Sequence, residues 1–319
     1  MSAAPGHPRA GSHRSPPGEG SPVSGGSFSA DWLRQREPFD AAARQTAAAR
    51  LLPRLQASRP PDGRPWRVID LACGTGANLR WLAPRLGGPQ QWLVVDHDAA
   101  LLRCWPERLG LASKDTPARQ EPLVFDGPGF EARIVRQQAD LATQLEALPW
   151  HAAGLVTASA LLDLVGADWL DRLASSATSA RVALLLALSV DGRHLWSPPD
   201  PLDATVGRLF ADHQRRDKGL GPALGAAAVA VLRARLQAEG YQVFSAASDW
   251  RIDGSAGPQD VALQRALIDG IAAAATEQSP DSVAALRSWR QRRRALCATA
   301  RLRVGHVDLL ALPPEGVRD

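Results

Sequence analysis

Residues Val68–Leu102 read VIDLACGTGANLRWLAPRLGGPQQWLVVDHDAALL, and this stretch decides the fold class. An apolar run predicts a buried strand over 66–72. The glycines that follow, Gly74 and Gly76, predict a tight turn into a helix over 77–86. A second apolar run predicts a strand over 91–96 that ends in Asp96. Strand, helix and strand in this order are typical of a parallel sheet.

The same alternation continues along the chain and extends the predicted sheet. Further strands are expected at 133–137, 154–159, 180–190, 241–247 and 301–313. Further helices are expected at 99–109, from Asp168, within 221–240, and twice within 258–297. Residues 30–57 are mostly helical by pattern, with Asp31 as the N-cap and an interruption near Pro38. The pattern therefore predicts a doubly wound α/β fold with helices on both faces of the sheet.

Composition limits the class of protein. The chain has 319 residues, of which 45% are hydrophobic, and a formal net charge of +4. That size suits one large α/β domain or two small ones, and the mild charge does not indicate nucleic acid. Three cysteines without a C-x-x-C spacing and scattered histidines predict free thiols and no metal site. A Pro-, Gly- and Ser-rich stretch predicts a disordered tail over 1–29.

Targeting signals are the remaining global feature. No apolar run approaches the roughly 18 residues of a membrane span, and the tail has no apolar segment typical of a secretory signal. We therefore expect a cytoplasmic protein without a membrane partner, either a monomer or a homodimer. The domain that follows the tail is expected to cover 30–319.

The turn between the first two strands predicts a nucleoside site. Its glycines let backbone N–H groups approach a ligand, and Asp96, placed 20 residues after Gly76, can accept hydrogen bonds from ribose hydroxyls. A dinucleotide motif would have a third glycine where this chain has Leu79. Asp70 adds a negative charge, which opposes a pyrophosphate and favours a cationic ligand. S-adenosylmethionine, with an ammonium and a sulfonium, fits these residues better than NAD.

The stretches VIDLACGTGANLRWL and WLVVDHDAALL resemble the first two motifs of the class I S-adenosylmethionine-dependent methyltransferases. QQADL, LVTASALLDLV and LRVGHVDLLALP are similar to the later elements of that family, so the resemblance covers about residues 65–311. It implies a Rossmann-like, doubly wound, seven-stranded and mostly parallel sheet. It also implies a reversed C-terminal strand inserted between the fifth and sixth strands.

The resemblance also implies a set of cofactor-binding residues. The methionine part would lie near Asp70, Gly74, Gly76 and Asn78, with Ala72 where the family often has glycine. Asp96 would bind the ribose, and His97 would lie against the adenine. Asp140 would accept from the adenine amino group while Leu141 packs on the ring. Ser159, at the end of the fourth strand, completes the expected set.

Residues after the fourth and fifth strands are candidates for the chemistry. Asp163 is predicted to orient or deprotonate the methyl acceptor, although a helix-capping role also fits it. The segment 210–225 is predicted to cover the acceptor, with His213 and Asp217 as catalytic candidates beside Arg216 and Lys218. A solvated surface loop is the alternative. His194 and Trp196 are expected in the same wall, and His151 and His306 are expected to be structural.

The helical insertion at 258–297 contains SWRQRRRAL, in which Arg290, Arg292, Arg293 and Arg294 follow Trp289. Arginines beside an aromatic residue suit RNA, whereas arginines spread around a helix suit a solvated surface. The favoured function is an S-adenosylmethionine-dependent methyltransferase acting on a small molecule. The alternatives are an RNA methyltransferase, a nucleotide-dependent oxidoreductase, and a non-catalytic binding protein with the cofactor fold.

Overall fold

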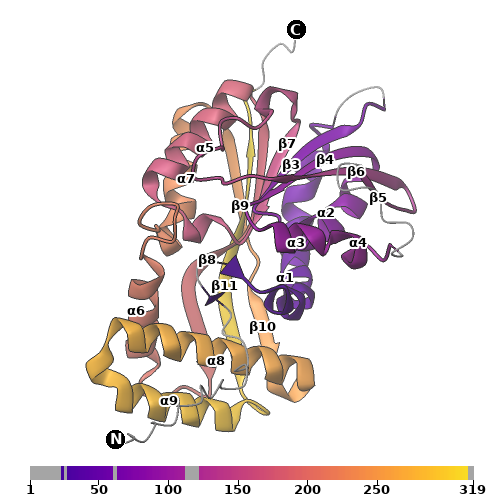
Figure 1. Cartoon of the computed structure of the whole chain (residues 1–319). Helices are drawn as coiled ribbons and strands as arrows, with labels where there is room; N and C mark the ends of the chain where they lie inside the picture. Colours follow the sequence, from indigo (N-terminus) through magenta and orange to yellow (C-terminus); the bar gives the residue numbers. More distant parts are fainter. Residues whose placement is uncertain (1–22, 25–26, 60–62, 112–121, 315–319) are drawn as a thin grey trace, which may run out of the picture.

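The computed structural model of the chain describes residues 23–24, 27–59, 63–111 and 122–314. A nine-stranded sheet in the order β10-β11-β8-β7-β3-β4-β6-β5, with β9 also paired to β11, forms the centre of the molecule (Figure 1). The strands are β3 (Trp66–Leu71), β4 (Gly88–Asp96), β5 (Leu123–Gly127), β6 (Phe130–Gln138), β7 (Leu155–Ser159), β8 (Ala183–Ser197), β9 (Gln242–Ala247), β10 (Trp250–Asp253) and β11 (Arg301–Leu312).

The sheet is mostly parallel, as expected. The pairs β6·β4, β4·β3, β3·β7 and β7·β8 are parallel, while β11 runs antiparallel to β8, β9 and β10, and β5 runs antiparallel to β6. Seven strands therefore share one direction, and β5 and β11 are reversed. The insertion of β11 between β8 and β9 confirms the expected reversed C-terminal strand. The expected seven strands are all present, and β5 and β10 are additions.

Helices cover both faces of the sheet. The helices are α1 (Ala30–Gln56), α2 (Ala77–Leu86), α3 (Ala99–Arg103), α4 (Trp105–Arg108), α5 (Ala167–Ala180), α6 (Asp203–Gln214), α7 (Ala228–Ala238), α8 (Pro258–Gln278) and α9 (Val283–Leu296). Buried residues of α1, α2 and α4 form one apolar layer with the sheet, and those of α5 and α7 form the opposite layer. The fully buried Leu79 fills the first layer, where a third glycine of a dinucleotide motif would lie.

A lower lobe extends beyond the carboxyl ends of the parallel strands (Figure 1). It consists of β10, α6, α8, α9 and the adjoining ends of β8 and β11. The strand expected at 180–190 continues as β8 to Ser197, because its second half pairs with Arg301–Val304 of β11. The helical insertion expected at 258–297 is present as α8 and α9, and it packs on α6.

The amino-terminal elements correct three expectations. Ser29, rather than Asp31, is the N-cap of α1, because its side chain accepts from the backbone N–H of Trp32. The helix runs through Pro38 without interruption, and its buried face contacts α2, β9, β10 and β11 along its length. The expected tail, 1–29, lies largely outside the described residues. Within it, β1 (Val23–Ser24) and β2 (Ser27–Phe28) form an antiparallel pair.

Candidate functional site

A cavity of about 820 Å³ opens where the carboxyl ends of β3, β4 and β7 meet α1 and the loop after α6. Ligands of open α/β sheets bind at this edge of the sheet. Nine of the ten residues predicted to bind the cofactor line the cavity: Asp70, Ala72, Gly74, Asn78, Asp96, His97, Asp140, Leu141 and Ser159. Gly76, the N-cap of α2, is not a lining residue, although its neighbours Thr75 and Ala77 are.

The glycine turn and the end of β4 are held together by one carboxylate. Asp96 Oδ2 accepts from the backbone N–H of Gly74 at 2.8 Å, and Oδ1 accepts from the N–H of Asp98 at 2.9 Å. Burial raises the pKa of Asp96, and these two hydrogen bonds act against that rise. The carboxylate is thus fixed at the edge of the cavity, beside His97, whose Nδ1 lies 3.4 Å from Oδ1.

Backbone geometry explains both glycines in the turn. Gly74 has φ +52° and Gly76 has φ +86°, a region that disfavours side chains. A Cβ at Gly76 would also lie 3.0 Å from the ring of Trp105. Ala72 has φ +50°, so the position where we expected a tolerable alanine at a strand end is in fact left-handed and strained. A glycine would adopt this conformation without strain.

Asp70 lies at the bottom of the cavity and is fully buried. Its Oδ1 accepts from Asn78 Nδ2 at 2.7 Å, while Oδ2 has no hydrogen-bond partner within the described residues. Burial raises the pKa of Asp70 to about 7, and the hydrogen bond from Asn78 opposes that rise. A buried carboxyl without full hydrogen bonding favours a cationic group beside it.

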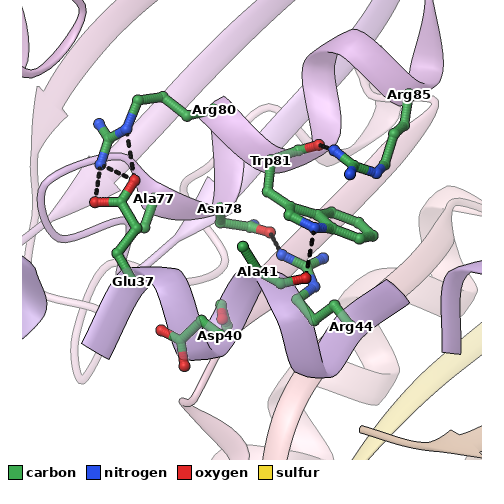
Figure 2. Close-up of a pocket in the computed structure, with 10 residues that line it drawn as sticks. Glu37, Asp40, Ala41, Arg44, Ala77, Asn78, Arg80, Trp81 and Arg85 are labelled. Atoms are coloured by element: carbon green, nitrogen blue, oxygen red, sulfur yellow. Dashed lines mark hydrogen bonds and ion pairs between the residues drawn. The ribbon is translucent and has the colours of Figure 1, made fainter. Parts of the chain in front are cut away.

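Asn78 connects this carboxyl to α1 through a residue that sequence reasoning missed. Asn78 Oδ1 accepts from Arg44 Nη1 at 2.9 Å, and Arg44 also lies 3.7 Å from Asp308 on β11. A smaller cavity of about 260 Å³ lies here between α1 and α2 (Figure 2). The Arg44 guanidinium stacks 3.9 Å from the centre of the Trp81 ring. Arg44 therefore orients Asn78 and joins three elements beneath the main cavity.

The predicted adenine side is built from the turn after β6. Asp140 Oδ1 accepts from the N–H of Ala142 at 2.9 Å, and the Asp140 N–H donates to Gln144 Oε1. Leu141 is buried, and its carbonyl accepts from Trp169 Nε1 at 2.9 Å. Both residues line the cavity together with His97. The turn is therefore rigid and presents one carboxylate and one apolar side chain to the ligand.

The start of α1 forms the wall opposite Asp70, and the sequence analysis did not assign it to the site. Phe28, Leu33, Arg36 and Asp40 line the cavity from this side. Arg36 donates to both oxygens of Asp40, with Nε–Oδ2 2.9 Å and Nη2–Oδ1 3.2 Å. Trp250 Nε1 also donates to Asp40 at 2.9 Å. The i, i+4 spacing of Arg36 and Asp40 was the available sequence signal.

The loop after α6 closes the cavity, as predicted for 210–225. Lys218, Gly219 and Leu220 line it. The Leu220 carbonyl accepts from the N–H of Gly166 at 2.8 Å, and a Cβ at Gly166 would lie 3.0 Å from that oxygen. Arg216 Nη2 donates to the Glu277 carbonyl and to Gln278 on α8. The loop is thus anchored both to the core and to the lower lobe.

The three catalytic candidates occupy different environments. His213 and Asp217 line the cavity, but His213 Nε2 lies 2.9 Å from Glu277 Oε2 and Asp217 accepts from the N–H of Gly219 at 2.7 Å. Asp163 is 6% exposed and stands behind the lining, with Oδ1 lacking a hydrogen-bond partner among the described residues. Burial raises the pKa of Asp163, and the charges of Lys218 and Arg36 oppose the rise.

The arginines of α9 are engaged within the lower lobe. Arg290 and Arg294 pair with Asp269, Arg292 pairs with Asp200, and the buried Arg293 pairs with Asp203. Their partners are aspartates of the chain itself, so this helix does not present four uncompensated charges to RNA. His194 and Trp196 pack on Phe210 and Trp289 in the same lobe rather than in the cavity wall.

Two further features concern metals and membranes. In the parts of the chain that the structure describes, no group of three or more His, Cys, Asp or Glu side chains could hold a metal ion. Cys73, Cys104 and Cys297 are free thiols. None of the helices in the described ranges combines the length and apolar character needed to cross a membrane.

Comparison with known proteins finds only distant similarity to solved structures. No protein-family model and no curated protein sequence matches the chain. Among solved structures, it is similar to phosphoethanolamine N-methyltransferase 2 of Haemonchus contortus bound to phosphomonomethylethanolamine and S-adenosylhomocysteine. The identity is 13% and the TM-score 0.42, over 89% of this chain, which spans only 57% of that enzyme.

Two further similar structures match most of both chains. One is an S-adenosylmethionine-dependent methyltransferase of Geobacter sulfurreducens in complex with S-adenosylhomocysteine, with 17% identity, a TM-score of 0.37 and coverage of 88% and 98%. The other is the cyclopropane synthase MmaA2 of Mycobacterium tuberculosis, with 10% identity, a TM-score of 0.38 and coverage of 82% for each chain. At these identities the likeness concerns the fold and assigns no role to a residue.

Proposed function

We propose that the protein is an S-adenosylmethionine-dependent methyltransferase that acts on a small molecule. The observation that carries the proposal is the pair of buried carboxyls, Asp70 and Asp96, on either side of one glycine turn in a single cavity. Asp96 is placed to accept from ribose hydroxyls. Asp70 offers an unpartnered oxygen to a cationic group.

The glycine turn with Asp70 and Asp96 forms the floor of the cavity. The negative charge of these two carboxyls favours this cofactor over a dinucleotide. A buried carboxyl with a pKa of about 7 is stabilised in its ionised form by a neighbouring ammonium. A pyrophosphate at the same place would add like charge beside Asp70 and Asp96. Leu79, buried against the sheet, also replaces the glycine that brings a dinucleotide-binding helix close to its strand.

When bound, the cofactor supplies an electrophilic methyl group to the acceptor. The residues of the chain hold and align the two reactants and keep water out, which is the main requirement of such a transfer. Ser159, Ala160 and Leu161 at the end of β7 line the cavity between the floor and the loop 213–220. In our proposal the acceptor binds there, and the cavity of about 820 Å³ has room for both molecules.

The proposal revises the roles of the catalytic candidates. His213 and Asp217 line the cavity and can reach an acceptor proton once a ligand reorganises their present contacts. Asp163 does not line the cavity, so we assign it the role of positioning Lys218 and Arg36. This differs from the direct contact with substrate that its place in the sequence suggested.

The proposal is tested by methyl transfer from S-adenosylmethionine labelled in the methyl group. The protein is incubated with separated small-molecule, RNA and protein fractions of a cell extract, and label is counted in each. We expect label in the small-molecule fraction, and none with the Asp96→Ala variant. Label in RNA would favour the RNA alternative. Tight S-adenosylhomocysteine binding without labelling of any fraction would indicate a binding protein.

A further inference from the structure

The cavity has two charged poles, one lined by carboxylates and the other by cations and carboxylates. Asp70, Asp96 and Asp140 line it on the side of β3, β4 and β6, where we place the cofactor. The opposite side, formed by α1 and the loop after α6, contributes Arg36 and Lys218 together with Asp40, which is paired with Arg36, and Asp217, which accepts from the N–H of Gly219. The carboxylates of the first pole match the ammonium and hydroxyl groups of the proposed cofactor. The ammonium and hydroxyl groups of the cofactor do not account for Arg36 and Lys218.

The guanidinium of Arg36 is held by two of its three nitrogens, and the third, Nη1, is available to a ligand. Its Nε and Nη2 donate to Asp40, whose carboxylate is also fixed by Trp250 Nε1. The guanidinium lies 5.1 Å from the centre of the Trp250 ring. Within the described residues Nη1 has no hydrogen-bond partner. A guanidinium fixed in this way presents its remaining donors without a further entropic cost.

Lys218 lies on the same wall. Its ammonium forms no hydrogen bond or ion pair with any residue in the described ranges, although the loop that holds it is anchored to Gly166 and α8. Lys218 and Arg36 line the same cavity, and the charges of both lower the pKa of the buried carboxyl of Asp163. The other cation of this loop, Arg216, is already bonded to Glu277 and Gln278.

We propose that Arg36 and Lys218 form an anion-binding subsite that holds a carboxylate or phosphate group of a ligand in the main cavity. The inference rests on the proposed function for the placement of the cofactor. The anion has two possible sources, the carboxylate of the cofactor itself or an anionic group of the methyl acceptor. Charged hydrogen bonds of this kind change affinity by about tenfold to a hundredfold.

The experiment measures affinities by calorimetry in two arms. The first titrates S-adenosylhomocysteine and its decarboxylated analogue, 5′-(3-aminopropylthio)-5′-deoxyadenosine, into the protein. The second titrates benzoate and inorganic phosphate into the protein saturated with S-adenosylhomocysteine. Both arms use Arg36→Met and Lys218→Met. Lys218 is exposed on a loop, so its variant tests the proposal even where loss of the Arg36–Asp40 pair affects folding.

Matched controls remove the same charge outside the cavity. Arg34→Met lies on the same helix, where Arg34 pairs with Asp31 and its side chain is 63% exposed. Arg215→Met lies in the same loop, where Arg215 pairs with Asp212 and its side chain is also 63% exposed. Both controls should bind every probe as the wild type does, and melting temperatures should confirm that all four variants are folded.

The two sources give different results. In one outcome, the affinity for S-adenosylhomocysteine falls about tenfold or more in Arg36→Met and Lys218→Met, while the affinity for the decarboxylated analogue does not change. The subsite then holds the cofactor carboxylate. If benzoate or phosphate binds the saturated wild type and not the variants, the subsite holds the acceptor. Unchanged binding in both arms overturns the inference. Failure of the wild type to bind either nucleoside overturns the proposed function instead, and benzoate and phosphate titrated into the free protein then decide the subsite.

Discussion

The two sides of the cavity differ in how the chain builds them. The floor, formed by the glycine turn and the ends of β3 and β4, comes from one continuous stretch, 68–102. The far wall combines the start of α1, the end of β7 and the loop after α6, which come from three separate parts of the chain, 28–40, 159–164 and 213–220. The floor contains the groups that suit a nucleoside, whereas the wall contains the groups that face the acceptor.

This difference separates cofactor binding, which we propose for the floor, from the selection of the acceptor, which we propose for the wall. Hydrogen bonds within the stretch, such as the one that Asp96 accepts from the N–H of Gly74, fix the glycine turn, and Arg44 of α1 orients Asn78 below it. The wall depends on tertiary contacts, including Trp250 to Asp40 and Gly166 to Leu220. Changes to the floor should therefore have the largest effect on cofactor affinity, and changes to the wall should affect that affinity less and should alter the choice of acceptor.

The largest effect is expected from the floor. Asp96→Ala removes the acceptor for the ribose hydroxyls and should weaken S-adenosylhomocysteine binding by about 10- to 300-fold. Calorimetry measures the affinity, and the melting temperature of the free variant reports on the loss of the Gly74 and Asp98 hydrogen bonds. Normal affinity in a folded variant would remove Asp96 from the nucleoside site.

Asp70→Asn should weaken the binding of S-adenosylhomocysteine by about tenfold at pH 7.5, because the ammonium of the ligand loses its charged partner. The wild-type affinity should rise between pH 6 and 7.5 as Asp70, with a pKa of about 7, ionises, and the variant should lack this rise. Calorimetry at several pH values measures both. A variant with the same pH profile as the wild type would show that another group binds the ammonium.

The same substitution should stabilise the free protein. Because burial raises the pKa of Asp70 from 3.8 to about 7, the folded state binds its proton more tightly than the unfolded state. Stability from this group is therefore present below about pH 4 and is lost as the pH rises to about 7. Denaturant unfolding should show Asp70→Asn more stable than the wild type at pH 8 and equal to it at pH 4.

A smaller effect is expected at the amino terminus. Phe28 lines the cavity and Ser29 caps α1. Deletion of residues 1–28 should weaken the binding of S-adenosylhomocysteine about two- to fivefold, since Phe28, an apolar residue of the wall, is lost. Deletion of residues 1–22 should leave the affinity unchanged. Equal affinities of the two truncated proteins would show that Phe28 does not contact the cofactor.

The smallest effect concerns strain in the floor. Ala72→Gly relieves a left-handed alanine at φ +50° but adds chain entropy to the unfolded state. These opposing effects should raise the free energy of unfolding by up to about 1 kcal/mol. Denaturant unfolding measures the change. A clear loss of stability would show that the alanine methyl group contributes packing that outweighs its strain.

The residues of the floor could be predicted from the sequence because they lie close together in one short stretch. The stretch containing Gly74, Gly76 and Asp96 predicted the turn, the strand end and the parallel arrangement of the two strands. Arg36 could not be placed in the site, because its position depends on how α1 crosses the sheet and meets Trp250. The length of β8 was underestimated for a related reason. Its second half is stabilised by pairing with Arg301–Val304, more than a hundred residues later.

Asp163 shows the limit of motif order as a guide to chemistry. Its position after the fourth strand suggested contact with substrate, yet a 3-10 turn at Leu162–Leu164 directs the carboxyl behind the wall. The tertiary fold gives that carboxyl the neighbours Lys218 and Arg36 instead. In our proposal Asp163 lies at the expected place in the sequence and acts through Lys218 and Arg36.

The central claim is that the floor binds S-adenosylmethionine, and titration of the wild-type protein with S-adenosylhomocysteine and with NAD tests it most directly. We expect one S-adenosylhomocysteine per chain by calorimetry, no heat from NAD, and S-adenosylhomocysteine binding that is about 10- to 300-fold weaker in Asp96→Ala. Binding of NAD with no binding of S-adenosylhomocysteine would contradict it.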